Sequence, residues 1–227
     1  MGKRGAMIVL DGMVGCGKTT QMDAVKRELW RQGVDHFSGR EPGGVPSAEK
    51  IRSVILDPEN REMHPLAVTF MFEAARAEYF AKLVIPTIES GKTVVTDRSY
   101  FSTIAFQGYG SGVPVSQIEK YNHDAVFGYH PDITFLLDVE NVRGAVMRAQ
   151  MASGKLGEPD RFEQEDLDFH TRLRDGYRAI PEMYPEMKIH LVPHFEEEVG
   201  AEKQIARKGE YILSKLTPFL EEYFTKK

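Results

Sequence analysis

The chain has 227 residues, and its 34 acidic side chains outnumber its 29 lysines and arginines, giving a formal charge of −5. This acidic balance argues against a nucleic-acid partner, and the single cysteine, Cys16, excludes an intramolecular disulfide and a zinc site built from several thiolates. The apolar runs are too short to cross a membrane or to form a signal-peptide core, so we expect no membrane partner and a cytoplasmic location.

Short apolar segments alternate with longer amphipathic ones along the chain. Strands are predicted at residues 7–10, 93–96, 133–139 and 189–192, and helices at residues 19–32, 47–56, 66–89, 115–127, 142–151, 163–183 and 199–224. Strands separated by helices indicate a parallel sheet covered on both faces, so the predicted fold class is α/β. The length fits a single domain over residues 1–227.

Two segments have the composition of loops. Residues 40–44 read Arg-Glu-Pro-Gly-Gly, and residues 152–160 are rich in Gly, Ser, Lys and Pro between two predicted helices. The second segment suits either a mobile lid or a solvated connector, and its composition alone leaves both interpretations open.

Residues 12–19, Gly-Met-Val-Gly-Cys-Gly-Lys-Thr, match the phosphate-loop pattern G-x-x-x-x-G-K-[ST] after a strand and before a helix. The glycines let several backbone N–H groups point at one phosphate, and the helix N-terminus adds partial positive charge. Lys18 is predicted to reach the β- and γ-phosphates of a nucleoside triphosphate, and Thr19 to offer a hydroxyl to Mg²⁺. The predicted nucleotide-binding residues here are Gly12, Gly15, Cys16, Gly17, Lys18, Thr19 and Thr20.

The dipeptide Asp97-Arg98 follows the strand predicted at residues 93–96. Side chains at the carboxyl end of a parallel strand gather at the mouth of the sheet, beside the phosphate loop. Asp97 is therefore predicted to hold Mg²⁺ through water and Arg98 to grip a phosphate. The sequence has no Asn-Lys-x-Asp guanine signature, which argues against a GTPase.

From about residue 7 to residue 177 the chain resembles the thymidylate kinases, a family of P-loop nucleoside-monophosphate kinases. The segments that carry the resemblance, besides the phosphate loop, are REPGG at 40–44, IRSVIL at 51–56, MFEAAR at 71–76, DR at 97–98, STIAFQG at 102–108, PD at 131–132 and DRFEQEDLDF at 160–169. The resemblance implies a three-layer fold with about five parallel strands and a short lid at about 152–162. It also implies phosphoryl transfer from ATP, with Mg²⁺, to dTMP for dTTP synthesis.

The resemblance further implies roles for individual residues. Phe72 would stack on thymine, Arg76 would hydrogen-bond the pyrimidine edge, and Phe106 would crowd the sugar 2′ position. Taken as an isolated helix, this segment would instead favour Phe72 in the core and Arg76 at the surface. The other implied acceptor residues are Arg40, Pro42, Arg52, Arg98, Thr103 and Gln107. Arg148 would pack on adenine. A homodimer would use the helix face with Tyr79, Phe80 and Leu83, although this face would equally suit the core of a monomer.

Four positions depart from the family pattern. Val14 stands where these kinases usually carry an acidic residue that meets the sugar 3′-hydroxyl, Ser99 where Tyr or His is common, and Thr103 where some relatives have Asn. Lys155 is the only basic residue between Arg148 and Arg161, so it is the predicted lid cation in place of an arginine. Two alternatives stay open: a related kinase for another deoxynucleotide or a deoxynucleoside, and a nucleotide-binding protein without catalysis.

Overall fold

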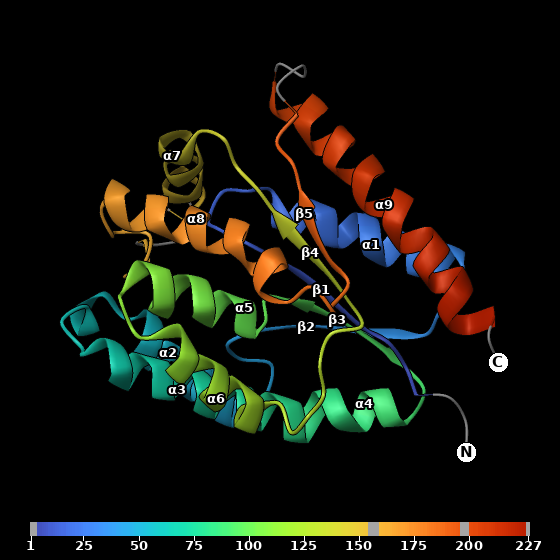
Figure 1. The fold of residues 1–227 in the computed structure, drawn as a ribbon, viewed down its shortest axis with the longest axis horizontal. Helices are drawn as coiled ribbons and strands as arrows, with labels where there is room; N and C mark the ends of the chain where they lie inside the picture. Colours follow the sequence, from blue (N-terminus) through green and yellow to red (C-terminus); the bar gives the residue numbers. More distant parts are fainter. Residues whose placement is uncertain (1–3, 154–158, 196–199, 226–227) are drawn as a thin grey trace.

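The computed structural model describes residues 4–153, 159–195 and 200–225. These residues form a five-stranded sheet in the order β2-β3-β1-β4-β5, with every neighbouring pair parallel (Figure 1). The strands are β1 Met7–Gly12, β2 His36–Arg40, β3 Thr93–Asp97, β4 Ile133–Leu137 and β5 Ile189–Val192. The predicted α/β class with about five parallel strands is confirmed.

Strand β2 was not predicted from the sequence. It lies at the sheet edge, and every side chain from His36 to Arg40 is at least partly exposed. An edge strand of this kind lacks the apolar pattern by which buried strands are identified. Its register sets Arg40 beside Asp97 of β3, so the 40–44 loop begins at the carboxyl edge of the sheet.

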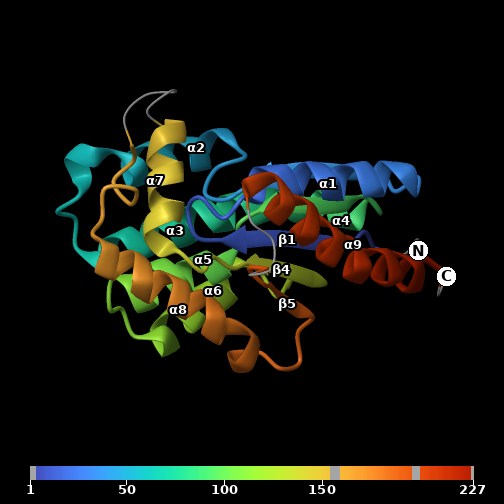
Figure 2. The same ribbon diagram turned by 90° about the horizontal axis from the view of Figure 1, so that it is seen from above.

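Helices cover both faces of the sheet. The α-helices are α1 Lys18–Arg31, α2 Pro46–Leu56, α3 Pro65–Tyr79, α4 Ile85–Glu89, α5 Tyr100–Thr103, α6 Val115–Ala125, α7 Val142–Ser153, α8 Leu167–Met183 and α9 Ala201–Thr225, together with the 3₁₀ turn η1 Pro58–Asn60 and the π-helical segments η2 Phe80–Val84 and η3 Ile104–Gly110. Helices α1 and α9 pack side by side against the sheet, and α3, α5, α6 and α8 gather on its other side (Figures 1 and 2).

Two helix predictions need correction, and one helical segment was missed. The helix predicted at 66–89 consists of α3, η2 and α4, with a π-helical turn in its middle. The helix predicted from residue 163 begins at Leu167, because the Asp166 carboxylate caps it by accepting a hydrogen bond from Phe169 N at 2.6 Å. The helical segment α5–η3 was not predicted at all.

The core lies against the central strands. All residues of β1 and β4 are buried, and so are all of β3 except Asp97 at its end. Tyr79 and Phe80 are fully buried in the same core, so the prediction that they form a dimer face is wrong. Among the helices of the described residues, none is long and apolar enough to cross a membrane.

Candidate active site

The phosphate loop joins β1 to α1 as predicted. Gly12, Gly15 and Gly17 have positive φ angles of 144°, 68° and 92°, which favour glycine. At Gly15 a Cβ atom would lie 2.0 Å from the carbonyl oxygen of Ala145, so no larger residue fits without a backbone shift. Gly17, the residue at the N-cap of α1, has no side chain that could cap the helix, so the first N–H groups of α1 can bind an anion.

Lys18 lies at the start of α1 and faces the end of β3. Its Nζ is 3.2 Å from the Asp97 carboxylate, and the side chains are 11% and 32% exposed. The register that pairs Leu10 with Asp97 brings the carboxylate beside the phosphate loop. Asp97 and the exposed Thr19 supply the oxygen donors that Mg²⁺ prefers, so these residues fit the predicted metal role in company with nucleotide phosphates and water.

Arg98 follows β3 in an unusual backbone conformation. Its φ is 73°, in the left-handed region, and its N–H donates to Leu10 O at 2.9 Å. A non-glycine residue in this region marks a place where the surrounding structure imposes the geometry. The next residue is Ser99, where the family pattern commonly has Tyr or His. Its hydroxyl has a structural role here, because it accepts a hydrogen bond from Phe101 N and caps α5.

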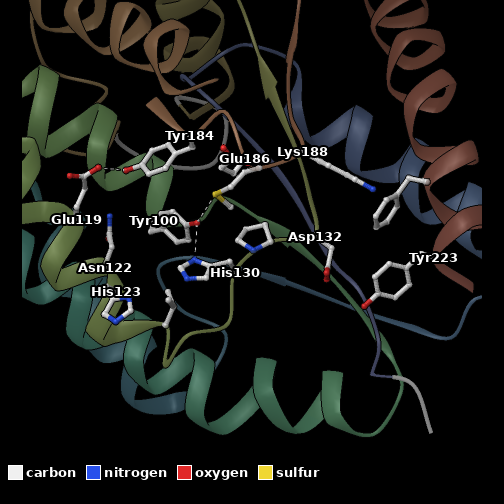
Figure 3. A pocket seen from close by; sticks show the side chains of 14 residues that line it. Tyr100, Glu119, Asn122, His123, His130, Asp132, Tyr184, Glu186, Lys188 and Tyr223 are labelled. Atoms are coloured by element: carbon white, nitrogen blue, oxygen red, sulfur yellow. Dashed lines mark hydrogen bonds between the residues drawn. The ribbon is translucent and has the colours of Figure 1, made fainter. Parts of the chain in front are cut away.

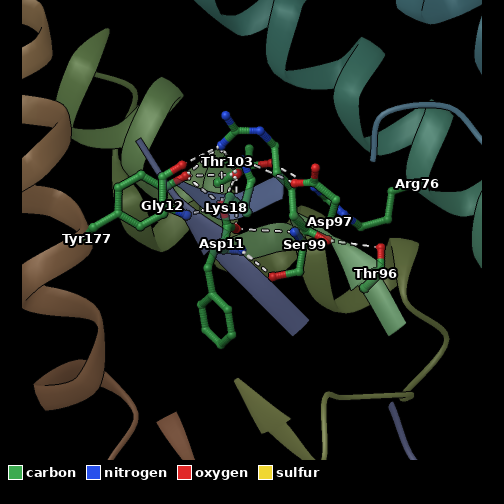
Figure 4. A network of polar contacts seen from close by, with 12 residues as sticks. Asp11, Gly12, Lys18, Arg76, Thr96, Asp97, Ser99, Thr103 and Tyr177 are labelled. Atoms are coloured by element: carbon green, nitrogen blue, oxygen red, sulfur yellow. Dashed lines mark hydrogen bonds and ion pairs between the residues drawn. The ribbon is translucent and has the colours of Figure 1, made fainter. Parts of the chain in front are cut away.

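One nitrogen of the Arg98 guanidinium makes its contacts to the polar network that includes Asp11, Gly12 and Tyr177 (Figure 4). The two N–H groups of Nη1 are shared among four oxygens within hydrogen-bond distance: Gly12 O at 2.8 Å, Tyr177 Oη at 3.1 Å, Ser102 Oγ at 3.2 Å and Asp11 Oδ1 at 3.3 Å. No described residue accepts a hydrogen bond from its Nε or Nη2. These two donors are therefore available to a substrate phosphate.

Asp11 is the buried anchor of this arrangement. It is fully buried, and it accepts hydrogen bonds from Tyr177 Oη at 2.8 Å and from Ser102 Oγ at 2.8 Å. Burial raises the pKa of Tyr177, so its hydroxyl keeps its proton and donates. Sequence reasoning missed Asp11, Ser102 and Tyr177, because 166 residues separate Asp11 from Tyr177 and no motif spacing connects them.

Two pockets meet at this point. The larger, of about 820 Å³, contains the predicted Gly15, Cys16, Gly17, Lys18, Thr19, Thr20 and Arg148, with the unpredicted Val139, His194, Gln204 and Lys208. The smaller, of about 240 Å³, contains the predicted Pro42, Arg52, Phe72, Asp97, Arg98, Phe106 and Gln107, with the unpredicted Leu56, Asp160, Phe162 and Glu163. The residues that line both are Val14, Lys18, Arg98 and Glu163.

Aromatic rings form the inner part of the smaller pocket. Phe162 lies against Phe72 and Phe106, with ring centroids 6.0 Å and 5.4 Å apart, and the Arg98 guanidinium is 5.3 Å from the Phe106 ring. Gln107 is 1% exposed, and its Oε1 is buried without a hydrogen-bond partner among the described residues. The pocket therefore combines flat apolar faces with an unused acceptor, which suits a ring that carries an N–H group.

Other predicted residues lie outside the smaller pocket. Arg40 is exposed and paired with Glu49 at 2.8 Å. Arg76 and Thr103 are each 1% exposed and lie behind the pocket, where Arg76 Nη2 donates to Thr103 Oγ1 at 3.0 Å. Lys155, the predicted lid cation, lies outside the described residues, as do residues 154–158 of the predicted lid.

Arg76 is enclosed by a second buried network. It donates to Glu41 and Glu73 at 2.7 Å each and to Asn122 Oδ1 at 3.0 Å. Burial raises the pKa of Glu41 to about 7, against the attraction of Arg76. Burial alone would lower the pKa of Arg76, but the two carboxylates outweigh it and raise that pKa.

The comparisons with known proteins agree with this geometry. The model of the thymidylate kinase family matches residues 10–202. The chain is similar to a thymidylate kinase of Geobacter sp. (strain M21), with 39% identity over 185 residues, 80% of this chain and 81% of the relative. A thymidylate kinase of Halalkalibacterium halodurans is 36% identical over 188 residues, 83% of this chain and 88% of the relative. The crystal structure of thymidylate kinase from Ehrlichia chaffeensis matches with a TM-score of 0.72 at 28% identity, over 94% of this chain and 99% of that chain.

Proposed function

This chain belongs to the thymidylate kinase family, and from that membership we propose that it transfers the γ-phosphoryl group of ATP to dTMP, giving dTDP and ADP. The observation that carries the proposal is the meeting of two pockets at Lys18 and Arg98. A donor nucleotide on the phosphate loop and an acceptor in the smaller pocket would place their phosphates between these two cations.

The chemistry needs cations more than a base. An oxygen of the dTMP phosphate attacks the γ-phosphorus in line, and the bond from that phosphorus to the β,γ-bridging oxygen breaks. The acceptor oxygen is already anionic, so no residue has to remove a proton. Lys18 and the free donors of Arg98 stabilise the charge on the transferred group, and Mg²⁺ held near Thr19 and Asp97 would neutralise the leaving ADP.

The acceptor pocket also suits thymine. Phe72 offers a ring face for stacking, and the unpartnered Gln107 Oε1 matches the thymine N3–H. Phe106 beside Arg98 would crowd a 2′-hydroxyl and so favour deoxyribose. Arg76 and Thr103 stay predicted contacts to the base, and such a contact would require Arg76 Nη2 to turn from its bond with Thr103.

Glu163 is the acidic residue placed to replace the one missing at position 14. It lines both pockets together with Val14, and no described cation pairs with its carboxylate. Within the part of the chain that the structure describes, its side chain accepts one hydrogen bond, a long one of 3.4 Å from Asp160 N. We assign it the sugar 3′-hydroxyl, which Val14 cannot bind.

The assembly and location stay predictions. Exposed apolar side chains suited to a homodimer lie on α2 and α3, at Val54, 42% exposed, and Phe70, 47% exposed. This patch replaces the face predicted around Tyr79 and Phe80. Cytoplasmic location rests on the short apolar runs of the sequence, and the lid role of Lys155 rests on the family resemblance.

The function is tested by ADP release with ATP, Mg²⁺ and a panel of dTMP, dUMP, dCMP, dGMP, UMP, 3′-deoxy-dTMP and thymidine. Preference for dTMP supports the proposal. Preference for thymidine would indicate a deoxynucleoside kinase, and nucleotide binding without turnover would indicate a non-catalytic protein.

The same assay tests Glu163. In Glu163→Gln we expect kcat/KM for dTMP to fall by about tenfold while that for 3′-deoxy-dTMP stays within about twofold, since only dTMP has the hydroxyl. Equal losses for both acceptors would contradict the assignment. Glu165→Gln, on the same turn but outside both pockets, is the control.

A further inference from the structure

A separate cavity of about 640 Å³ lies away from the two pockets of the active site (Figure 3). It is lined by α6, by α9 and by the segments that precede β4 and β5. The phosphate loop follows the carboxyl end of β1, and the strands are parallel, so this cavity lies toward the opposite end of the sheet. None of the roles assigned above uses it.

Asn122 joins this cavity to the buried network around Arg76. It is 4% exposed, lines the cavity, and accepts a hydrogen bond from Arg76 Nη1 at 3.0 Å through Oδ1. A guanidinium only donates, so this contact fixes the orientation of the amide and directs Nδ2 away from Arg76. Nδ2 is buried and has no acceptor among the described residues. A buried donor left unused in this way indicates a missing acceptor.

A hydrogen-bond acceptor and two aromatic rings lie in the cavity lining near Asn122. Glu119 lies three residues earlier on α6, on the same helix face, and its Oε1 accepts from Tyr184 Oη at 2.8 Å (Figure 3). Tyr100 and Tyr184 place aromatic rings in the same lining. The Asn122 amide would donate to an acceptor atom of a heterocyclic ring, and the Glu119 carboxylate would accept from an N–H group next to it. The two tyrosines offer faces on which such a ring could stack.

The charge of the lining argues against a phosphate. Asp132 is paired with Arg4 at 2.6 Å, which leaves the carboxylates of Glu119 and Glu186 against the ammonium of Lys188. Burial lowers the pKa of His130, so this imidazole is held neutral. A nucleotide phosphate would meet net negative charge here, whereas an uncharged ring would not.

We propose that the cavity is a regulatory site for an uncharged nucleobase or nucleoside, whose acceptor atom takes the Asn122 N–H and whose N–H group meets Glu119. Asn122 transmits occupancy to Arg76, the predicted base contact of the acceptor pocket, so the affinity for dTMP changes. This second step rests on the proposed function, while binding itself does not.

Binding is tested by isothermal titration calorimetry with cytidine as the probe. The enzyme is first saturated with dTMP and ADP, which fills both active-site pockets. We expect saturable binding in the high micromolar range, as a ligand of this size allows, and about tenfold weaker binding of cytidine 5′-monophosphate. Glu119→Gln and Asn122→Asp, which keeps an acceptor for Arg76 but removes the N–H, should each weaken cytidine binding by about fivefold or more. Asp124→Asn removes a carboxylate from α6 outside the lining and should change nothing.

Three results would overturn the site: no saturable binding to the saturated enzyme, as expected if water alone meets the Asn122 N–H; binding that neither variant weakens; or equal binding of the monophosphate. The link to Arg76 is tested by the KM for dTMP, which saturating cytidine should change in the wild type but not in Glu119→Gln. An unchanged KM in the wild type would overturn the link. Calorimetry needs no turnover, so a failed kinase assay would count against the proposed function and leave the binding result intact.

Discussion

Arg98 and Arg76 both contact buried carboxylates, but Arg98 keeps 20% of its side chain exposed, whereas Arg76 is enclosed. Arg98 directs a single nitrogen, Nη1, at four protein oxygens, its Nε and Nη2 have no acceptor among the described residues, and its side chain lines both pockets. Arg76 engages Nε, Nη1 and Nη2 and is 1% exposed. The comparison indicates that Arg98 is positioned for substrate, whereas Arg76 first of all holds the fold around the acceptor pocket.

Changing Arg98 tests most directly whether this guanidinium acts in the reaction. In Arg98→Lys the charge remains but the planar fork is lost, so the group can no longer hold Asp11 and Gly12 and also reach a phosphate. We expect kcat to fall by about 100-fold to 1000-fold, as when one donor to a developing charge is removed. Steady-state kinetics measure it, and Arg174→Lys, a change at an exposed pair on α8, should leave kcat unchanged. A loss below about threefold would show that Arg98 is not part of the reaction.

Changing Arg76 should affect mainly the stability of the fold. Arg76→Met leaves Glu41 and Glu73 buried without their cation, and breaking a buried pair in this way costs about 3–5 kcal/mol of unfolding free energy. Urea denaturation measures it. The control Arg61→Met removes an exposed guanidinium from a surface pair with Glu62 and should change stability little. If Arg76→Met were as stable as the wild type, the network would not hold the fold.

Changing Tyr177 tests whether its hydroxyl positions Arg98. Tyr177→Phe removes the hydroxyl that donates to Asp11 and lies 3.1 Å from Arg98 Nη1. With Arg98 less firmly placed, we expect kcat to fall by about tenfold and the KM for ATP to stay constant. Tyr184→Phe, which removes the hydroxyl bonded to Glu119 just after the same helix, is the matched control. Equal effects of the two variants would contradict a positioning role.

The smallest expected effect concerns the pH dependence of stability. Burial raises the pKa of Glu41 from 4.5 to about 7, so between these values the folded protein binds more protons than the unfolded chain. The contribution of Glu41 to unfolding free energy is full below about pH 4.5 and is lost as the pH rises through about 7. Wild type minus Glu41→Gln, measured by urea denaturation at pH 5, 6, 7 and 8, isolates this contribution. A difference that grows with pH would contradict the sign.

The parts of the site that sequence predicts are local in the chain. The phosphate loop and Asp97-Arg98 each follow a strand directly, so strand and helix patterns sufficed to place Lys18, Thr19, Asp97 and Arg98 together. The roles of Asp11 and Tyr177 were not predicted, because these two residues come into contact only when α8 packs against the sheet. The edge strand β2 escaped for a different reason, its lack of buried apolar side chains.

In the proposed reaction, a phosphoryl group passes from a nucleotide in the larger pocket to a nucleotide in the smaller pocket, between Lys18 and Arg98. The most direct test follows phosphorus-31 NMR spectra of ATP, Mg²⁺ and dTMP with the wild type. We predict that dTDP and ADP appear in equal amounts, and that Arg98→Lys slows both together. Release of inorganic phosphate in place of dTDP, or ADP formation that does not depend on dTMP, would contradict the claim.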